Sequence, residues 1–222
     1  MSLAIFDLDN TLLNGDSDYL WGQFLVEQGI VDGDDYEQKN QQYYQAYLDG
    51  TLDIMEFLRF SLNPLSQHDS EQLKIWHQQF MQEKIRPIIL EAGRALLEKH
   101  RNQSDTLLII TATNLFVTGP IARELGVDHI IATEPEMIDN RYTGNVSGIP
   151  CFREGKVQRL ELWIKEHGMK VHNVTLDDSW FYSDSHNDIP LLEKVSHPVA
   201  TDPDDQLAEH AKTCGWPIIS LR

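Results

Sequence analysis

Short apolar runs and helically spaced apolar residues alternate along most of this chain. Short apolar runs predict buried strands at residues 3–6, 107–111, 130–133 and 180–183, with 198–201 as a fifth, and the run 107–111 is rich in branched residues. Apolar residues at helical spacing predict helices between them, including 87–100, where Pro87 suits the first turn, and 157–167, which Gly168 would end. This alternation predicts an α/β protein with a doubly wound, mostly parallel, Rossmann-like sheet.

One segment departs from that pattern toward a β-hairpin. Residues 137–149 read MIDNRYTGNVSGI, and the Asp139-Asn140 step inside them is a turn signal. Such a step between two short strand-forming runs is typical of a tight hairpin turn.

Residues 16–86 contain helical spacing and no strand pattern. Their aromatic residues recur at helical intervals, as in Tyr36, Tyr43 and Tyr47, and the segment predicts a four-helix cap between the first and second strands. The chain would then divide into a core of residues 1–15 and 87–222 and a cap of 16–86. We expect the cap aromatics to form its core rather than a ligand platform. The crossings near Asn14-Gly15 and Arg86-Pro87 would act as hinges.

Composition narrows the possible functions. The net charge of −17 over 222 residues disfavours nucleic-acid binding, because phosphate backbones require Lys and Arg. The two cysteines, Cys151 and Cys214, lie far apart and form no CxxC pair, so we expect two buried thiols. The acidic N-terminus and the lack of a long apolar run predict a cytoplasmic protein without membrane association.

Acidic residues follow two of the predicted strands directly. Asp7 and Asp9 come after the first strand, and Asp184 and Asp188 after the fourth. The carboxyl ends of parallel strands share one sheet edge, so these carboxylates would meet. Because like charges at close range repel each other, a hard divalent cation is the expected compensation, and oxygen-only ligation favours Mg²⁺. Turn formation at Asp7 and Asp9, and helix capping by Asp188, are the competing interpretations.

Three further groups would complete a phosphoryl-transfer site. Thr111 and Ala112 end a strand at the same edge and offer a hydroxyl and backbone N–H groups. Lys156 opens a helix, where its ammonium can neutralise a phosphate, although a lysine in that place is usually a surface residue; Arg153 is a nearby substitute. Asn187 lies between the two late aspartates.

With these residues in order, the sequence resembles the haloacid-dehalogenase-like hydrolases, particularly their phosphoserine-phosphatase-like branch. The resemblance covers the whole chain: DLDNTL, Thr111, Lys156 and the Asp184-to-Asp188 motif follow the family's order, and the insertion falls where that branch carries its cap.

The resemblance implies a role for each matching residue. Asp7 would be the nucleophile and Asp9 the acid and base. Thr111 and Lys156 would bind the phosphoryl group. Asp7, the backbone carbonyl of Asp9 and Asp184 would ligate Mg²⁺, with Asp188 supporting them, and Asn187 would help hold the phosphate or the attacking water.

The resemblance also bears on the substrate. Asp16 stands at the offset where the phosphoserine phosphatases place an acid for the substrate's ammonium group. In the segment FLRFSL, Arg59 matches a family arginine, whereas Ser61 replaces the arginine that holds the substrate carboxylate. An amine receptor without a carboxylate receptor favours a phosphorylated amino alcohol, and histidinol phosphate is our leading hypothesis.

Alternative functions remain open on the sequence alone. The substrate could be phosphoserine or another small phosphomonoester. The chain could be a phosphotransferase or mutase that uses the same aspartyl-phosphate, or a binding protein on this fold. Its assembly could be a monomer or a homodimer.

Overall fold

The computed structural model describes residues 2–167 and 175–222. The predicted end of a helix at Gly168 lies outside the described residues. The strands are β1 (Leu3–Phe6), β2 (Thr106–Asn114), β3 (His129–Ile138), β4 (Arg141–Ser147), β5 (Ser179–Ser183), β6 (His197–Thr201) and β7 (Ile218–Ile219). The α-helices are α1 (Ser17–Glu27), α2 (Gly33–Leu48), α3 (Ile54–Ser66), α4 (Ser70–Phe80), α5 (Glu91–Asn102), α6 (Leu115–Glu124), α7 (Glu154–His167), α8 (Ile189–Leu192) and α9 (Asp205–Cys214).

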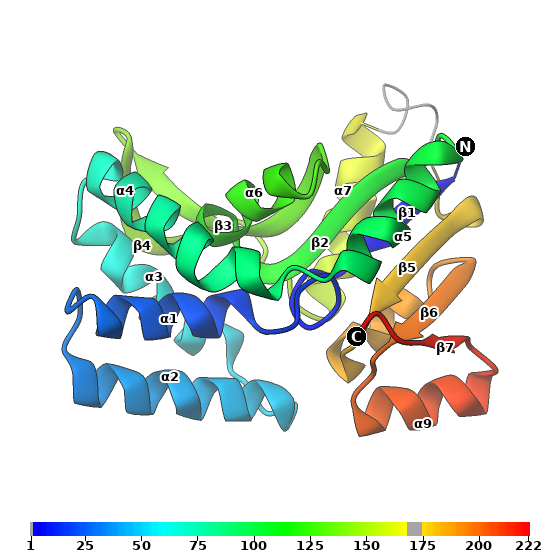
Figure 1. Ribbon diagram of the computed structural model, residues 1–222, viewed down its shortest axis with the longest axis horizontal. Helices are drawn as coiled ribbons and strands as arrows, with labels where there is room; N and C mark the ends of the chain where they lie inside the picture. The colour runs from blue at the N-terminus through cyan, green and yellow to red at the C-terminus, as the bar shows by residue number, and fades with distance from the viewer. Residues whose placement is uncertain (1, 168–174) are drawn as a thin grey trace.

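The strands form one sheet in the order β4-β3-β2-β1-β5-β6-β7, parallel except for β4 (Figure 1). In chain order, β2, β3 and β4 are added on one side of β1. The later strands β5, β6 and β7 are added on its other side. The carboxyl end of β1 therefore lies at the point where strand order reverses, which is the usual ligand site of such sheets. The predicted α/β class with a mostly parallel, doubly wound sheet is confirmed.

Alternating side chains of the central strand enter two different hydrophobic clusters. Ala4 and Phe6 face one cluster, which includes residues of α5 and α6, while Leu3 and Ile5 face the other, with residues of α7, α8 and α9. All four side chains are fully buried. This burial on both faces is why the run LAIF reads as continuous rather than alternating apolar sequence.

The structure corrects several expected boundaries. Strand β2 continues past Thr111 to Asn114, so Thr111 does not end its strand. Strand β3 does not stop at residue 133 but runs on to Ile138 and forms one arm of the predicted hairpin. Asp139 and Asn140 make its turn, both with positive φ, as their sequence predicts.

The expected helix from Pro87 also begins later than predicted. Pro87 lies in a short 3₁₀ turn (Arg86–Ile88), and α5 starts at Glu91. The intervening backbone is extended because it pairs with the other crossing: the Asn14 N–H donates to Ile88 and the Leu90 N–H to Leu12. The two crossings are thus hydrogen-bonded to each other.

Four α-helices, α1–α4, lie between β1 and β2 in the chain, and Figure 1 shows them beside the β3–β4 hairpin at one end of the sheet. They are called the inserted helices below. Asp53 caps α3 by accepting from Met55 N–H and Glu56 N–H. Trp21 and Phe80 share one hydrophobic cluster with the sheet and with α6. The division into core and cap, and the hinges, stay predictions.

The cysteine prediction holds for one residue only. Cys151 is fully buried, and burial raises its pKa to about 12. The prediction for Cys214 was wrong: it is exposed at the end of α9, next to the left-handed Gly215 that ends the helix. None of the helices in the described residues is both long and apolar enough to cross a bilayer.

Candidate active site

A buried ammonium joins carboxylates from two strand ends. The Lys156 ammonium donates to Asp7 Oδ1 at 2.8 Å and to Asp188 Oδ2 at 2.7 Å. Asp7 follows β1, Asp188 belongs to the turn after β5, and Lys156 lies in the first turn of α7. All three side chains are at most 6% exposed. The sequence predicts that the carboxylates that follow these two strands lie close together. The contacts of Lys156 bring Asp7 and Asp188 together in this way.

The start of α7 is packed so that Lys156 reaches inward. Gly155 precedes it, and a side chain there would collide with the carbonyl oxygen of Pro150. The glycine lets the first turn of α7 lie against the loop before it. Asp188 does not cap the following helix; its Oδ2 accepts from Lys156 and from the Ser183 hydroxyl. The capping interpretation is therefore wrong.

Charge in this cluster is unbalanced. Burial raises the pKa of Asp7 to about 8, against the opposing effect of Lys156, and the charges of Asp188 and Asp9 add to the rise. Burial also raises the pKa of Asp184 well above its usual range, and the negative charge of Asp7 increases it further. Asp184 Oδ1 accepts from the Thr11 hydroxyl at 3.0 Å.

The second aspartate of the opening motif faces a different set of partners. Asp9 Oδ1 accepts from the Ser17 N–H at 2.7 Å, and Oδ2 accepts from the hydroxyls of Thr111 and Thr113 at 3.3 and 2.9 Å. Burial raises its pKa, while these hydrogen bonds oppose the rise. Its carboxylate is thus directed toward β2 and α1.

Within residues 2–167 and 175–222, no three His, Cys, Asp or Glu side chains converge in the geometry of a metal site. Lys156 occupies the space between Asp7 and Asp188 instead. Nevertheless, two buried carboxylates, Asp7 and Asp188, share one ammonium, and burial and the negative charge of neighbouring carboxylates raise the pKa values of Asp7 and Asp184. The donor set therefore suits a hard cation that would neutralise the excess negative charge.

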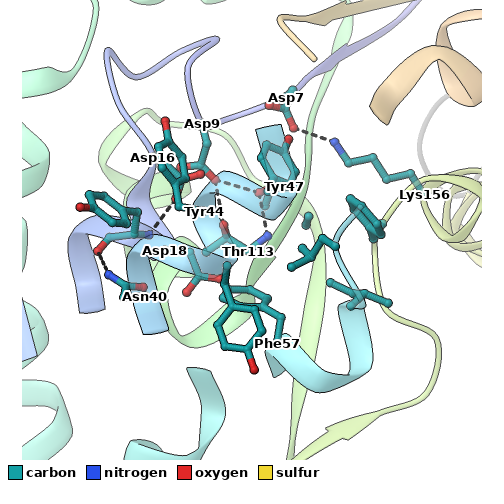
Figure 2. Close-up of a pocket in the computed structure, with 17 residues that line it drawn as sticks. Asp7, Asp9, Asp16, Asp18, Asn40, Tyr44, Tyr47, Phe57, Thr113 and Lys156 are labelled. Carbon is teal, nitrogen blue, oxygen red and sulfur yellow. Dashed lines mark hydrogen bonds and ion pairs between the residues drawn. The ribbon is translucent and has the colours of Figure 1, made fainter. Parts of the chain in front are cut away.

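A cavity opens from Asp7 toward the inserted helices (Figure 2). Asp7, Asp9, Thr111, Ala112, Thr113 and Lys156 form its sheet side. The inserted helices and their loops contribute aromatic and acidic residues, namely Asp16, Asp18, Tyr19, Asn40, Tyr43, Tyr44, Tyr47, Leu52, Ile54 and Phe57; Phe152 closes the wall.

This lining corrects the expectation that the inserted aromatics form only a core. Trp21, Phe24 and Phe80 are fully buried packing residues, as expected. Tyr43 and Tyr47, in contrast, line the cavity. Helical spacing identified the face that these tyrosines share, but it did not show that this face borders the cavity.

Two acids of α1 lie at the cavity. Asp16 is the N-cap of the helix, and its Oδ1 accepts from the Tyr19 N–H at 2.8 Å. Asp18, in the first turn, was not predicted as a site residue. It is 9% exposed, and burial and the charge of Asp9 raise its pKa to about 7.

Asn187 lies beside the cavity rather than in its lining. Its Oδ1 accepts from Arg153 Nε at 2.9 Å, and its Nδ2 donates to the carbonyl of Tyr47 at 3.3 Å. Arg153 Nη2 also donates to the carbonyl of Gly50. Arg153 and Asn187 thus fasten the end of α2 to the sheet side, a role that their sequence positions did not suggest.

The family model for haloacid dehalogenase-like hydrolases matches residues 4–193. The chain belongs to this family. The resemblance inferred from its motifs is therefore confirmed, and the protein is an enzyme of the family's phosphatase type.

One relative is similar over the whole chain. A histidinol-phosphatase of Neisseria meningitidis serogroup C (strain 8013) is 44% identical over 222 residues, which are 100% of this chain and 99% of that protein. A protein of unknown function from Bordetella pertussis Tohama I has the same fold with a TM-score of 0.92, at 42% identity over 100% of this chain and 99% of that one.

More distant structures share the fold alone. A substrate-bound phosphoserine phosphatase has a TM-score of 0.72 at 19% identity, covering 100% of this chain and 93% of that one. At this identity the similarity supports the architecture and leaves the substrate of this chain undecided.

Proposed function

We propose that this protein is a Mg²⁺-dependent phosphatase that hydrolyses a small phosphorylated amino alcohol, with histidinol phosphate as the preferred substrate. The observation that carries the proposal is the environment of Asp7. Lys156 holds its Oδ1, while Oδ2 has no hydrogen-bond donor among the described residues, and the side chain borders the cavity. A carboxylate held at one oxygen and free at the other is suited to nucleophilic attack.

The reaction would proceed in two displacements. Asp7 Oδ2 attacks phosphorus, the ester P–O bond breaks, and Asp9 gives its proton to the departing alkoxide. Asp9 then takes a proton from water, whose oxygen attacks phosphorus and releases Asp7 and inorganic phosphate. The raised pKa of Asp9 favours the protonated form that the first step requires.

Other residues would bind and neutralise the phosphoryl group. Lys156 and Thr111 border the cavity beside Asp7, and the backbone N–H of Ala112 lies between two threonines of β2. Asn187 would act from beside the cavity. Because Thr111 contacts Asp9 in the present structure, its hydroxyl would exchange this contact for a phosphate oxygen.

Asp7, Asp184 and the backbone carbonyl of Asp9 would hold Mg²⁺, with Asp188 supporting them. The cation would supply the positive charge that keeps Asp7 ionised and offsets the phosphate. The raised pKa values of the two buried aspartates, Asp7 and Asp184, support this assignment.

The cavity supports an amine-bearing substrate without a carboxylate. Lys156 is the only cationic side chain among its lining residues in the described part of the chain. Arg59 is exposed and borders a different surface hollow, and Ser61 is buried with an unpartnered hydroxyl. Asp16 would receive the substrate's ammonium. The 44% identical relative from Neisseria meningitidis is named a histidinol-phosphatase, which agrees with this chemistry.

The test is phosphate release from histidinol phosphate, phosphoserine, phosphoethanolamine and sugar phosphates, with Mg²⁺ and after chelation. We expect wild type to prefer histidinol phosphate and Asp7→Asn to lose at least about 10³-fold in kcat. Preference for phosphoserine would contradict the substrate assignment but keep the mechanism. Transfer of phosphate to an organic acceptor in place of release would identify a phosphotransferase.

A further inference from the structure

The carboxylate of Asp18 is buried at the cavity without a bonding partner. Its residue is 9% exposed, and no donor among the described residues reaches its oxygens. Burying a carboxylate without a partner is costly, and a group of this kind is retained where a ligand completes it. The arrangement therefore indicates that something other than the protein pairs with Asp18.

Its neighbour Asp16 is in a different situation. Asp16 accepts from the backbone N–H groups of Tyr19 and Asp18 and so caps α1. Part of its hydrogen-bonding capacity is already used for the helix. Of the two acids, Asp18 has the freer carboxylate.

The two acids also lie at different depths in the cavity. The negative charge of Asp16 contributes to the raised pKa of Tyr44, and so do the charges of Asp184 and Asp9 on the sheet side. The negative charge of Asp18 contributes instead to the raised pKa of Tyr36 in α2. Tyr36 does not line the cavity. Figure 2 likewise shows Asp7 and Lys156 at one side of the cavity and Asp18 away from them. Asp16 is thus nearer the reaction centre, and Asp18 is farther along.

The far end of the cavity offers two side-chain acceptors, the carboxylate of Asp18 and the Oδ1 of Asn40. Asn40 is 5% exposed and donates its Nδ2 to the carbonyl of Tyr19, which leaves its Oδ1 as an acceptor. Phe57 and Tyr43 pack edge to face, with ring centroids 5.5 Å apart, and together supply an aromatic wall. An acceptor pair with an aromatic wall suits a flat group that carries N–H donors.

We propose that Asp18 is a specificity-determining residue that receives an N–H of the substrate's heteroaromatic ring, which lies against the aromatic wall of Tyr43 and Phe57. This inference rests on the proposed function. A ligand that spans the cavity would present its phosphate to Asp7 and Lys156, its ammonium to Asp16 and its ring nitrogen to Asp18. Histidinol phosphate carries these three groups in that order.

The experiment compares two phosphate esters of different length. Histidinol phosphate carries the ring, whereas phosphoethanolamine has the phosphate and the amine alone. We expect Asp18→Asn to lower the ratio of kcat/KM for histidinol phosphate to kcat/KM for phosphoethanolamine by roughly 10- to 100-fold. The change should arise from a higher KM for histidinol phosphate, because a charge-assisted hydrogen bond to its ring is lost. Asp34→Asn, an exposed acid on α2, is the matched control and should leave the ratio unchanged.

A second measurement needs no turnover. Calorimetric binding of histidinol, which lacks the phosphate, should weaken in Asp18→Asn by a similar factor and stay unchanged in Asp34→Asn. Equal effects of Asp18→Asn on both esters, with histidinol binding unaltered, would overturn the subsite while the phosphatase function stands.

The remaining outcomes separate the two proposals. If wild type fails to cleave histidinol phosphate but binds histidinol in an Asp18-dependent way, the proposed function falls and the subsite survives. If wild type neither cleaves the ester nor binds histidinol, both proposals are overturned.

Discussion

The sheet side and the helix side of the cavity are built on different principles. On the sheet side, Asp7 and Lys156 project from a strand end and a helix start that are fixed by the buried parallel sheet. On the helix side, Asp18, Tyr43 and Phe57 come from three inserted helices that pack on one another. The first side is rich in charge and the second in aromatic surface (Figure 2).

This difference teaches where chemistry and selectivity reside. A site for phosphoryl transfer requires groups placed to within a fraction of an ångström, and strand ends supply such precision. Substrate choice requires only a fitting surface, which helices with interchangeable side chains provide. Variants on the sheet side should therefore change kcat for every substrate, whereas variants on the helix side should change KM for some.

After loss of the nucleophile in Asp7→Asn, the largest effect is expected from Asp9→Asn. The amide keeps the acceptor for Ser17 but cannot donate or take the reaction's proton. Turnover of histidinol phosphate should fall by roughly 10²–10⁴-fold, the usual contribution of general acid–base catalysis. With para-nitrophenyl phosphate, whose leaving group needs no proton, a burst of nitrophenol stoichiometric with enzyme should precede slow turnover. A stopped-flow trace without a burst would contradict the assignment of Asp9.

The next effect is on stability, in Lys156→Met. Removing the ammonium leaves Asp7 and Asp188 buried without their cation. Breaking a buried ion pair from one side costs about 3–5 kcal/mol, so urea unfolding in the absence of Mg²⁺ should show a loss of that order. Lys165→Met, on the exposed part of the same helix, is the control and should change the unfolding free energy by less than about 0.5 kcal/mol.

The sheet side could be predicted because topology places it. An apolar run followed by an acid, found at both Asp7 and Asp184, specifies a strand end, and parallel strands end at one edge. The error at Thr111 has a physical cause. Strand β2 has a register irregularity beyond Ile110 and continues through Thr113, which brings a second hydroxyl to Asp9. Local residue preferences do not reveal such an irregularity.

The helix side could not be predicted to the same extent. Asp18 is an acid in the first turn of a helix, where acids are common because they suit the helix dipole. What distinguishes Asp18 is its burial at the cavity, and this burial depends on the tertiary packing. For Tyr43 and Tyr47, spacing showed a shared helical face but not what that face borders, because the inserted helices pack on one another and on the sheet and also line the cavity.

A smaller effect is expected from Phe57→Leu, which keeps an apolar side chain but removes the aromatic wall. KM for histidinol phosphate should rise roughly tenfold, the usual worth of a partly desolvated ring contact, with kcat for para-nitrophenyl phosphate nearly constant. Met55→Leu, an exposed position on the same helix, controls for helix effects. An equal fall in kcat for both substrates would show that the two sides of the cavity are not separable.

The smallest effect is a pH-dependent gain of stability in Asp18→Asn. The pKa of Asp18 is raised to about 7 in the folded protein, by burial and by Asp9, from its usual value near 4 in an unfolded chain. Between these values the folded state binds the extra proton, so this carboxyl favours folding at low pH and loses that contribution as pH rises toward 7. The Asp18 carboxylate interacts electrostatically with three other titratable groups among the described residues: the carboxylates of Asp9 and Asp16 and the hydroxyl of Tyr36.

Replacing Asp18 by Asn removes this dependence and relieves the neighbouring charges. Relative to wild type, the variant should therefore gain stability between pH 5 and pH 6, by about 1 kcal/mol, in urea unfolding without Mg²⁺. Asp34→Asn should show no such trend. A constant difference across this range would mean that the Asp18 carboxylate is already ionised and solvated at pH 5. Stability gained by removing a group that selectivity requires is the expected signature of a residue kept for its ligand.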